Sequence, residues 1–133
     1  MAKVLMGAAC AAAMLAGLAG PAAAQNGGAK GPDAQAGQLL FNNACRTCHT
    51  IQEGDNRLGP SLHGIVGRKA GSLPNYGYSQ AIKESGLTWD EATLDRFIAN
   101  PDAVVSGNNM KPYGGLAVPE ERAKIVAFLK SGG

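Results

Sequence analysis

The chain has 133 residues, which is enough for one compact domain and leaves little room for a second. Its 12 Lys and Arg residues against 10 Asp and Glu residues give a net charge of +2, which excludes the strongly basic surface typical of a nucleic-acid-binding protein. The chain has only 3 cysteines and 2 histidines, so the positions of its thiol and imidazole groups are informative.

Residues 1–24 have the pattern of a cleavable export signal. Lys3 precedes an apolar, alanine-rich stretch from Val4 to Gly20, and residues 22–24 form an Ala-x-Ala processing site with cleavage expected before Gln25. The stretch is short for a membrane-spanning helix, and its many Ala and Gly residues weaken insertion, which favours cleavage over a membrane anchor. We therefore expect the protein to be exported, which in a bacterium means to the periplasm. In the chain that remains after cleavage, basic and acidic residues nearly balance.

A flexible leader is expected next, because residues 25–33 are small, polar and rich in glycine. A single domain over residues 34–133 follows, and its first helix is expected from Ala34 to about Cys48, where apolar residues recur at helical spacing. Gly37 lies four residues before Phe41 on the same face of this helix. Without a side chain there, another helix can approach closely.

The motif Cys45-Arg46-Thr47-Cys48-His49 follows this helix and is the most informative feature of the chain. Two thiols at this spacing can add to the two vinyl groups of one porphyrin, and the adjacent histidine can then bind the iron as an axial ligand. The alternatives are a zinc half-site, a redox Cys-x-x-Cys pair and a structural disulfide. The zinc site would need two further ligands, for which the chain without its signal offers only His63. The pattern favours covalent attachment of haem.

The chain after this motif contains little predicted regular structure. Residues 50–87 are rich in Gly and Pro, with one short helix at Ser79 to Glu84 at best. The next helix is expected to begin at Thr88, whose side chain would form a Thr-x-x-Glu capping box with Glu91, and to stop at Asn100-Pro101.

The last helix is expected from Pro119 to Lys130, because proline suits the first helical position and lysine complements the dipole at the end. Gly132 and Gly133 would leave its end unsupported. We expect the first and last helices to pack together. Since this core is thin, haem would complete it, and the chain without haem is expected to be largely unfolded.

A candidate for the second axial ligand is Met110, the only methionine that remains after cleavage of the signal. It lies in a segment rich in turn residues, where a methionine that merely fills the core is unusual. The rival ligand is His63, close to the turn at Gly59-Pro60 and not far along the chain from His49. The sequence favours Met110.

Taken together, these motifs resemble those of class I cytochromes c of the mitochondrial and soluble bacterial type. The resemblance covers essentially residues 34–131 and implies an all-α cytochrome c fold, with three main helices and irregular loops wrapped around one covalent haem c. The matching motifs occur in family order: Gly37-x-x-x-Phe41, Cys45-x-x-Cys48-His49, Gly59-Pro60-Ser61-Leu62-His63-Gly64, Gly67-Arg68-Lys69, Tyr78, Gly86-Leu87-Thr88-Trp89, Asn100-Pro101, Met110 and Glu121-Arg122.

The resemblance also implies roles for individual residues. Cys45 and Cys48 would carry the thioether bonds, and His49 and Met110 would bind the iron. The carbonyl of Pro60 would accept a hydrogen bond from the ring of His49. Three further residues match family positions that hydrogen-bond a haem propionate: Arg68, Tyr78 and Trp89. Tyr78 and Trp89 can equally serve as core packing.

The chain departs from the mitochondrial pattern in its interior and at its expected docking face. Phe97 and Ile82 replace a tyrosine and an asparagine, which makes the interior drier. Around the expected haem edge, positions that are usually lysine are instead Ala44, Asp102, Ala103, Ala117 and Val118. A nearly neutral docking face is therefore expected.

The function implied is that of a periplasmic one-electron carrier and not an enzyme, because His and Met ligation leaves no open position for a substrate. It would be a monomer that shuttles electrons from a respiratory or dehydrogenase donor, such as a cytochrome bc complex, to a terminal oxidase or reductase. The alternatives are a dedicated cytochrome subunit of a redox complex and a haem peroxidase-type enzyme.

Overall fold

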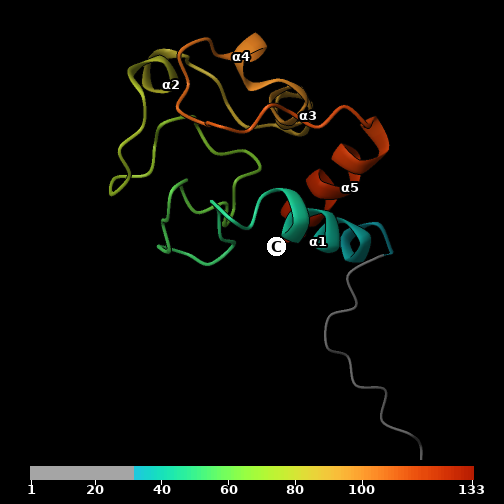
Figure 1. The fold of residues 1–133 in the computed structure, drawn as a ribbon. Coiled ribbons are helices and arrows are strands. Elements are labelled where there is room, and N and C mark those ends of the chain that lie inside the picture. The colour runs from blue at the N-terminus through green and yellow to red at the C-terminus, as the bar shows by residue number, and fades with distance from the viewer. Residues whose placement is uncertain (1–31) are drawn as a thin grey trace, which may run out of the picture.

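A computed structural model of the protein describes residues 32–133, so the expected export signal and most of the expected leader lie outside the described residues. Within the described range the chain forms helices and loops without a strand (Figure 1). This confirms the all-α fold class. The helices are α1 (Pro32–Ala44), α2 (Gln80–Glu84), α3 (Glu91–Ala99), α4 (Pro101–Val104) and α5 (Pro119–Lys130).

The two terminal helices, α1 and α5, lie side by side, as expected (Figure 1). A methyl group at Gly37 would lie 1.9 Å from the carbonyl oxygen of Lys124, so only glycine allows the backbones to come this close. One helical turn along, the rings of Phe41 and Phe128 pack with their centroids 5.4 Å apart. The prediction that Gly37 permits close approach of another helix is confirmed.

The ends of α1 differ from the prediction. The helix begins at Pro32, before the expected Ala34, because proline suits the first helical position and Asp33 lies in the first turn, where its charge favours the helix dipole. It ends at Ala44, before the expected Cys48. The N–H groups of Cys45 and Arg46 both bond to the carbonyl of Phe41, which tightens the chain into turns. The cysteines therefore lie on turns instead of on the helix.

The expected capping box at the start of α3 is wrong. Thr88 forms an isolated antiparallel bridge with Lys69, and this pairing keeps the chain extended before the helix. Asp90 is the cap instead, and its Oδ1 accepts a hydrogen bond of 2.7 Å from the N–H of Thr93. Glu91 is the first residue of the helix and not its capping partner.

The expected helix near Ser79 to Glu84 is confirmed as α2, with Ser79 as its cap. α4 was not predicted. Asn100 ends α3 as expected, but its side chain also accepts a hydrogen bond of 3.1 Å from Ala103 N–H and thereby caps a new helical turn that starts at Pro101.

The C-terminal glycines do not leave α5 unsupported, contrary to expectation. The N–H of Gly133 bonds to the carbonyl of Phe128, and the N–H of Gly132 bonds to that of Leu129. Gly133 also packs so closely on Ile51 that an added methyl group would lie 2.6 Å from its Cβ. The end of α5 is thus fixed against the loop that follows the cysteines.

Candidate cofactor-binding site

A deep, largely apolar cleft lies between the helices and the loop that follows α1. The cleft together with the open solvent at its mouth has a volume of about 1210 Å³. The end of α1, the 58–62 loop, α2, α3, the 108–113 segment and α5 all contribute to its wall. A cavity with this apolar character and few polar groups is typical of a site for a large hydrophobic cofactor.

Two free thiols lie on the wall of this cleft, those of Cys45 and Cys48. Burial, with a smaller contribution from the neighbouring Cys48, raises the pKa of Cys45 to about 11. A redox Cys-x-x-Cys pair needs the opposite shift, since the thiolate is the reactive form. Within residues 32–133, no group of three or more His, Cys, Asp or Glu side chains is arranged so that it could hold a metal ion.

The imidazole of His49 is buried against the same cleft and has a defined orientation. Its Nδ1 lies 2.8 Å from the carbonyl oxygen of Pro60. Because a carbonyl can only accept a hydrogen bond, Nδ1 carries the proton, so the neutral ring has its lone pair on Nε2. Burial, opposed by the Pro60 hydrogen bond and assisted by Arg68, lowers the pKa of His49. The lowered pKa favours the neutral ring at neutral pH, which is the form in which a histidine binds a metal.

Gly59 makes this arrangement sterically possible. A methyl group at this position would lie 2.3 Å from Cε1 of His49, well inside contact distance. The Gly59 N–H also bonds to the carbonyl of Cys48 at 2.8 Å, which joins the two ends of the intervening loop. The chain before Pro60 can therefore lie directly against the histidine ring.

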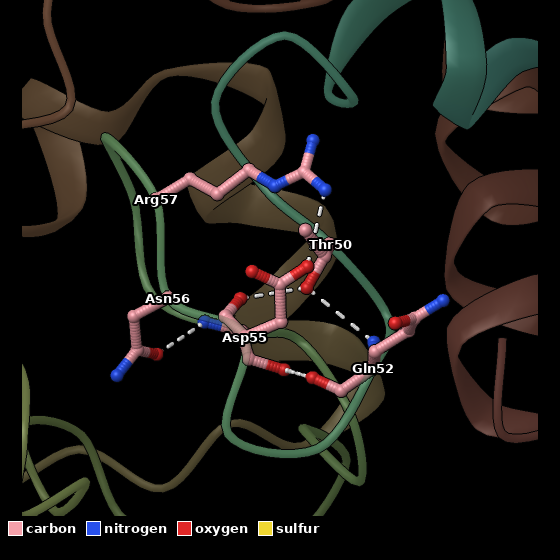
Figure 2. Close-up of polar contacts among 6 residues, drawn as sticks. Thr50, Gln52, Asp55, Asn56 and Arg57 are labelled. Atoms are coloured by element: carbon pink, nitrogen blue, oxygen red, sulfur yellow. Dashed lines mark hydrogen bonds and ion pairs between the residues drawn. The ribbon is translucent and has the colours of Figure 1, made fainter.

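Polar contacts within residues 50–61 hold this loop in shape (Figure 2). The hydroxyl of Thr50 donates to the carbonyl of Asp55 at 2.7 Å and accepts a longer hydrogen bond from Gln52 N–H. The N–H of Ser61 donates to the side-chain oxygen of Asn56 at 2.9 Å, and its hydroxyl donates to the carbonyl of Gln52. These bonds fix the residues next to both His49 and Pro60.

Met110 lines the cleft from the loop between α4 and α5 and is half-buried. Its N–H donates to the side-chain oxygen of Asn108 at 2.9 Å. His63, the rival ligand, is exposed and does not contribute to the cleft wall. The cleft thus brings together the two thiols, the neutral imidazole and one thioether, from segments far apart in the sequence.

Comparison with known proteins identifies the group of proteins that share this arrangement. A family model described as cytochrome c oxidase, cbb3-type, subunit III, matches residues 32–129. Cytochrome c2 iso-1 of Magnetospirillum fulvum is 48% identical over 90 residues, covering 67% of this chain and 91% of that protein. The chain belongs to the class I cytochrome c family. Cytochrome c of Arabidopsis thaliana is 40% identical over 99 residues, covering 74% of this chain and 88% of that protein.

The solved structure of cytochrome cH from Methylobacterium extorquens is similar in fold, with a TM-score of 0.69 and 41% sequence identity. The match covers 74% of this chain and 98% of that chain. The small cytochrome c fold expected from the sequence is confirmed. Membership of this family means that a covalently bound haem c is the cofactor, and the free thiols and neutral imidazole on the apolar wall fit it.

The three residues expected near the propionates line this cytochrome's cleft. Arg68 donates to the carbonyls of Ser61 at 2.8 Å and His63 at 3.1 Å. Trp89 is buried, and its ring packs edge-on against Phe97 with centroids 4.8 Å apart, so it contributes to the core whatever its other role. Its backbone pairs with that of Arg68, which brings the two residues together although they are distant in sequence.

Phe97 and Ile82, the two apolar replacements in the interior, are both buried and line the cleft. At the expected docking positions, Ala103, Ala117 and Val118 are exposed. Asp102 forms an exposed ion pair with Lys111 and so adds no net charge. These features agree with a dry interior and a nearly neutral face.

The sequence did not reveal the role of the residues that hold the loop after Met110, although Arg122 belongs to one of the matching motifs. Tyr113 donates to the carbonyl of Ile98 at 2.8 Å. Arg122 is buried, pairs with Asp95 at 2.8 Å and donates to the carbonyls of Leu116 and Ala117 at 2.9 Å. No local pattern indicates these contacts, because they connect different elements. The contact of Asn108 could have been predicted from the sequence, since an Asn side chain in a turn often accepts a hydrogen bond from the backbone N–H two residues later.

Proposed function

We propose that this cytochrome is a periplasmic one-electron carrier whose iron is bound by His49 and Met110. The observation that carries the proposal is the meeting of four side chains on one cleft: Cys45, Cys48, His49 and Met110. Thioethers from the two cysteines would attach the haem, whose iron supplies the one-electron chemistry.

The residues of the chain would occupy both axial positions of the iron and would keep its ligands the same in both oxidation states. His49 has only Nε2 free, because Pro60 holds Nδ1. With Met110 as the second ligand, no position remains for a substrate, which is why we propose a carrier and not an enzyme. The soft sulfur and the apolar walls both favour the reduced form and raise the reduction potential.

Arg68, Tyr78 and Trp89 are proposed to stabilise the haem propionates. The guanidinium of Arg68 lies on the cleft wall, and its partners Ser61 and His63 offer only neutral carbonyls. No acidic side chain within the described residues bonds to it, so a carboxylate can approach without displacing an ion pair.

Substitution of Met110 tests the ligand assignment. The purified oxidised protein is expected to show a sulfur-to-iron charge-transfer band, which Met110→Ala removes while His63→Ala retains it. The reduced parent protein should bind carbon monoxide slowly or not at all at neutral pH. Prompt stoichiometric binding by the parent protein would instead support a peroxidase-type or gas-binding enzyme.

Export and cleavage are proposed from the pattern of residues 1–24. The mature protein isolated from the periplasm is expected to begin at Gln25, which mass spectrometry of the intact protein can check. Within residues 32–133, no helix has the length and apolar character needed to cross a bilayer.

The proposed partners are redox proteins: a cytochrome bc complex or periplasmic dehydrogenase as donor, and a terminal oxidase or reductase as acceptor. A second candidate is a dedicated subunit of one redox complex, favoured by the matched family model, which is described as an oxidase subunit. Gel filtration of native periplasm and gently solubilised membranes separates the two. A free carrier elutes as a monomer, whereas a subunit co-elutes with one large complex.

A further inference from the structure

Asn108 occupies an unusual position for an amide side chain, because it is only 4% exposed and lies two residues before Met110. Its side-chain oxygen accepts a hydrogen bond of 2.9 Å from the N–H of Met110. Its side-chain nitrogen donates to the carboxylate of Asp102 at 2.9 Å and to the carbonyl of Val105 at 2.8 Å. Both hydrogens and the acceptor of this amide are therefore used.

These bonds connect the methionine to α4. Asp102 lies within α4 and Val105 is its C-terminal cap residue. Asp102 also forms an ion pair with Lys111, the residue after Met110. The backbone of Met110 and the side chain of Lys111 are thus both connected to one short helix, the first through the buried amide of Asn108 and the second through an exposed ion pair.

We propose that Asn108 is the positioning residue that keeps Met110 against the cleft and thereby controls how often the loop opens. This inference rests on the proposed function, in which Met110 binds the iron. Asn108 itself does not touch the iron in this scheme; it acts through the backbone of Met110. The exposed Lys111–Asp102 pair contributes less, since exposed ion pairs add little.

An amide is the side chain suited to this position. A carboxylate would lose both donors and would place a second negative charge beside Asp102. An apolar side chain would leave the Met110 N–H without its acceptor, whereas the Val105 carbonyl would keep the backbone N–H of residue 108 as a donor. Loss of these bonds favours the open loop, so an external ligand such as imidazole can reach the iron more often.

Asn108→Ala in the holoprotein tests the proposal through the kinetics of imidazole binding to the oxidised form. At saturating imidazole the observed rate reports opening of the Met110 loop. We expect this rate to rise about tenfold, because the one of the three lost side-chain hydrogen bonds that holds the Met110 N–H directly contributes about that much. The charge-transfer band should persist, which shows that Met110 is still bound in the closed state.

Asn100→Ala is the matched control, because the side chain of Asn100 caps α4 by accepting from Ala103 N–H, whereas the acceptor for the Met110 N–H is Asn108. Its opening rate should stay within about twofold of the parent rate, since only a helix cap is lost. Asp102→Ala removes one partner of Asn108 and the ion pair to Lys111, and an intermediate rise of about threefold is expected.

Two results would overturn the proposal in different ways. If the parent protein lacks the charge-transfer band, the ligation of Met110 and the role of Asn108 both fail. If the band is present but Asn108→Ala and Asn100→Ala open at the same rate, only the role of Asn108 fails. Should Asn108→Ala not fold, the same comparison between Asp102→Ala and Asn100→Ala decides the matter.

Discussion

The Nδ1 atom of His49 lies 2.8 Å from the carbonyl oxygen of Pro60, and Gly59 lies against the same imidazole ring without room for a methyl group. The orientation of the histidine thus depends on a residue that carries no functional group. The loop that ends at Pro60 is held by its own hydrogen bonds, which start at the residue after His49 (Figure 2). The same loop therefore positions both His49 and the Pro60 carbonyl that accepts its hydrogen bond.

Gly59→Ala is expected to lower the free energy of unfolding of the holoprotein by about 1 to 3 kcal/mol, because the methyl group would overlap the ring of His49. A weaker hydrogen bond to Pro60 would also make the imidazole less basic and raise the reduction potential. Denaturant unfolding and voltammetry measure the two effects. Gly114→Ala is the control, since nothing lies within 4 Å of a methyl group there. Equal effects from both substitutions would contradict the prediction.

Gly37→Ala is expected to destabilise the protein by about 1 to 3 kcal/mol although alanine is the better helix former. The added methyl group would lie 1.9 Å from a backbone oxygen of Lys124, which cannot move without separating α1 from α5. Gln38→Ala, at an exposed position of the same helix, should change stability by less than about 0.5 kcal/mol. Thermal unfolding of the two holoprotein variants provides the comparison. A Gly37→Ala variant as stable as the control would rule out tight packing here.

Asp90→Asn is expected to reduce stability at neutral pH and to do so less as the pH falls. The hydrogen bonds from Thr93 hold the pKa of the Asp90 carboxyl below its ordinary value in the folded protein. The charged carboxylate therefore stabilises the fold above the ordinary Asp pKa, and this contribution is lost as the pH falls through the folded-state pKa. Asparagine retains a capping oxygen but has no charge to titrate.

Denaturant unfolding of the parent protein and of Asp90→Asn, repeated at several pH values from neutral to acidic, measures how their difference in unfolding free energy changes and so tests this prediction. Thr88→Ala serves as the control for the cap itself. It should leave stability nearly unchanged, because Asp90 and not Thr88 accepts the hydrogen bond at the start of α3. A large loss of stability in Thr88→Ala would contradict this assignment and support the capping box predicted from the sequence.

Electron transfer with a partner is expected to depend weakly on ionic strength, because the docking positions carry alanine and valine, and Asp102 is paired with Lys111. The rate constant with an anionic iron cyanide complex, measured as a function of salt, is a direct test. Introducing lysine at Ala117 and Val118, both exposed, should raise the rate several-fold at low salt and steepen its decline. A steep decline already in the parent protein would contradict a neutral face.

The chain without haem is expected to be largely unfolded. The apolar walls contributed by α2, α3 and α5 face the cleft, so without the cofactor they would be left in water. The double substitution Cys45→Ala and Cys48→Ala prevents covalent attachment, and its NMR spectrum should show little dispersion after removal of any unattached haem. A well-dispersed spectrum would show instead that the core formed by α1 and α5 is sufficient.

The sequence by itself determined the cofactor motif, the fold class and the pairing of the terminal helices. These rest on local chemistry: two thiols at a fixed spacing beside a histidine, and a glycine one helical turn from Phe41. Tertiary structure decided which residues support that chemistry. Asp90 became the cap of α3 because Thr88 was held in a bridge with Lys69, and Asn108 met Asp102 because α4 formed where a stop was expected. Such outcomes depend on pairing between segments distant in sequence, which local patterns do not record.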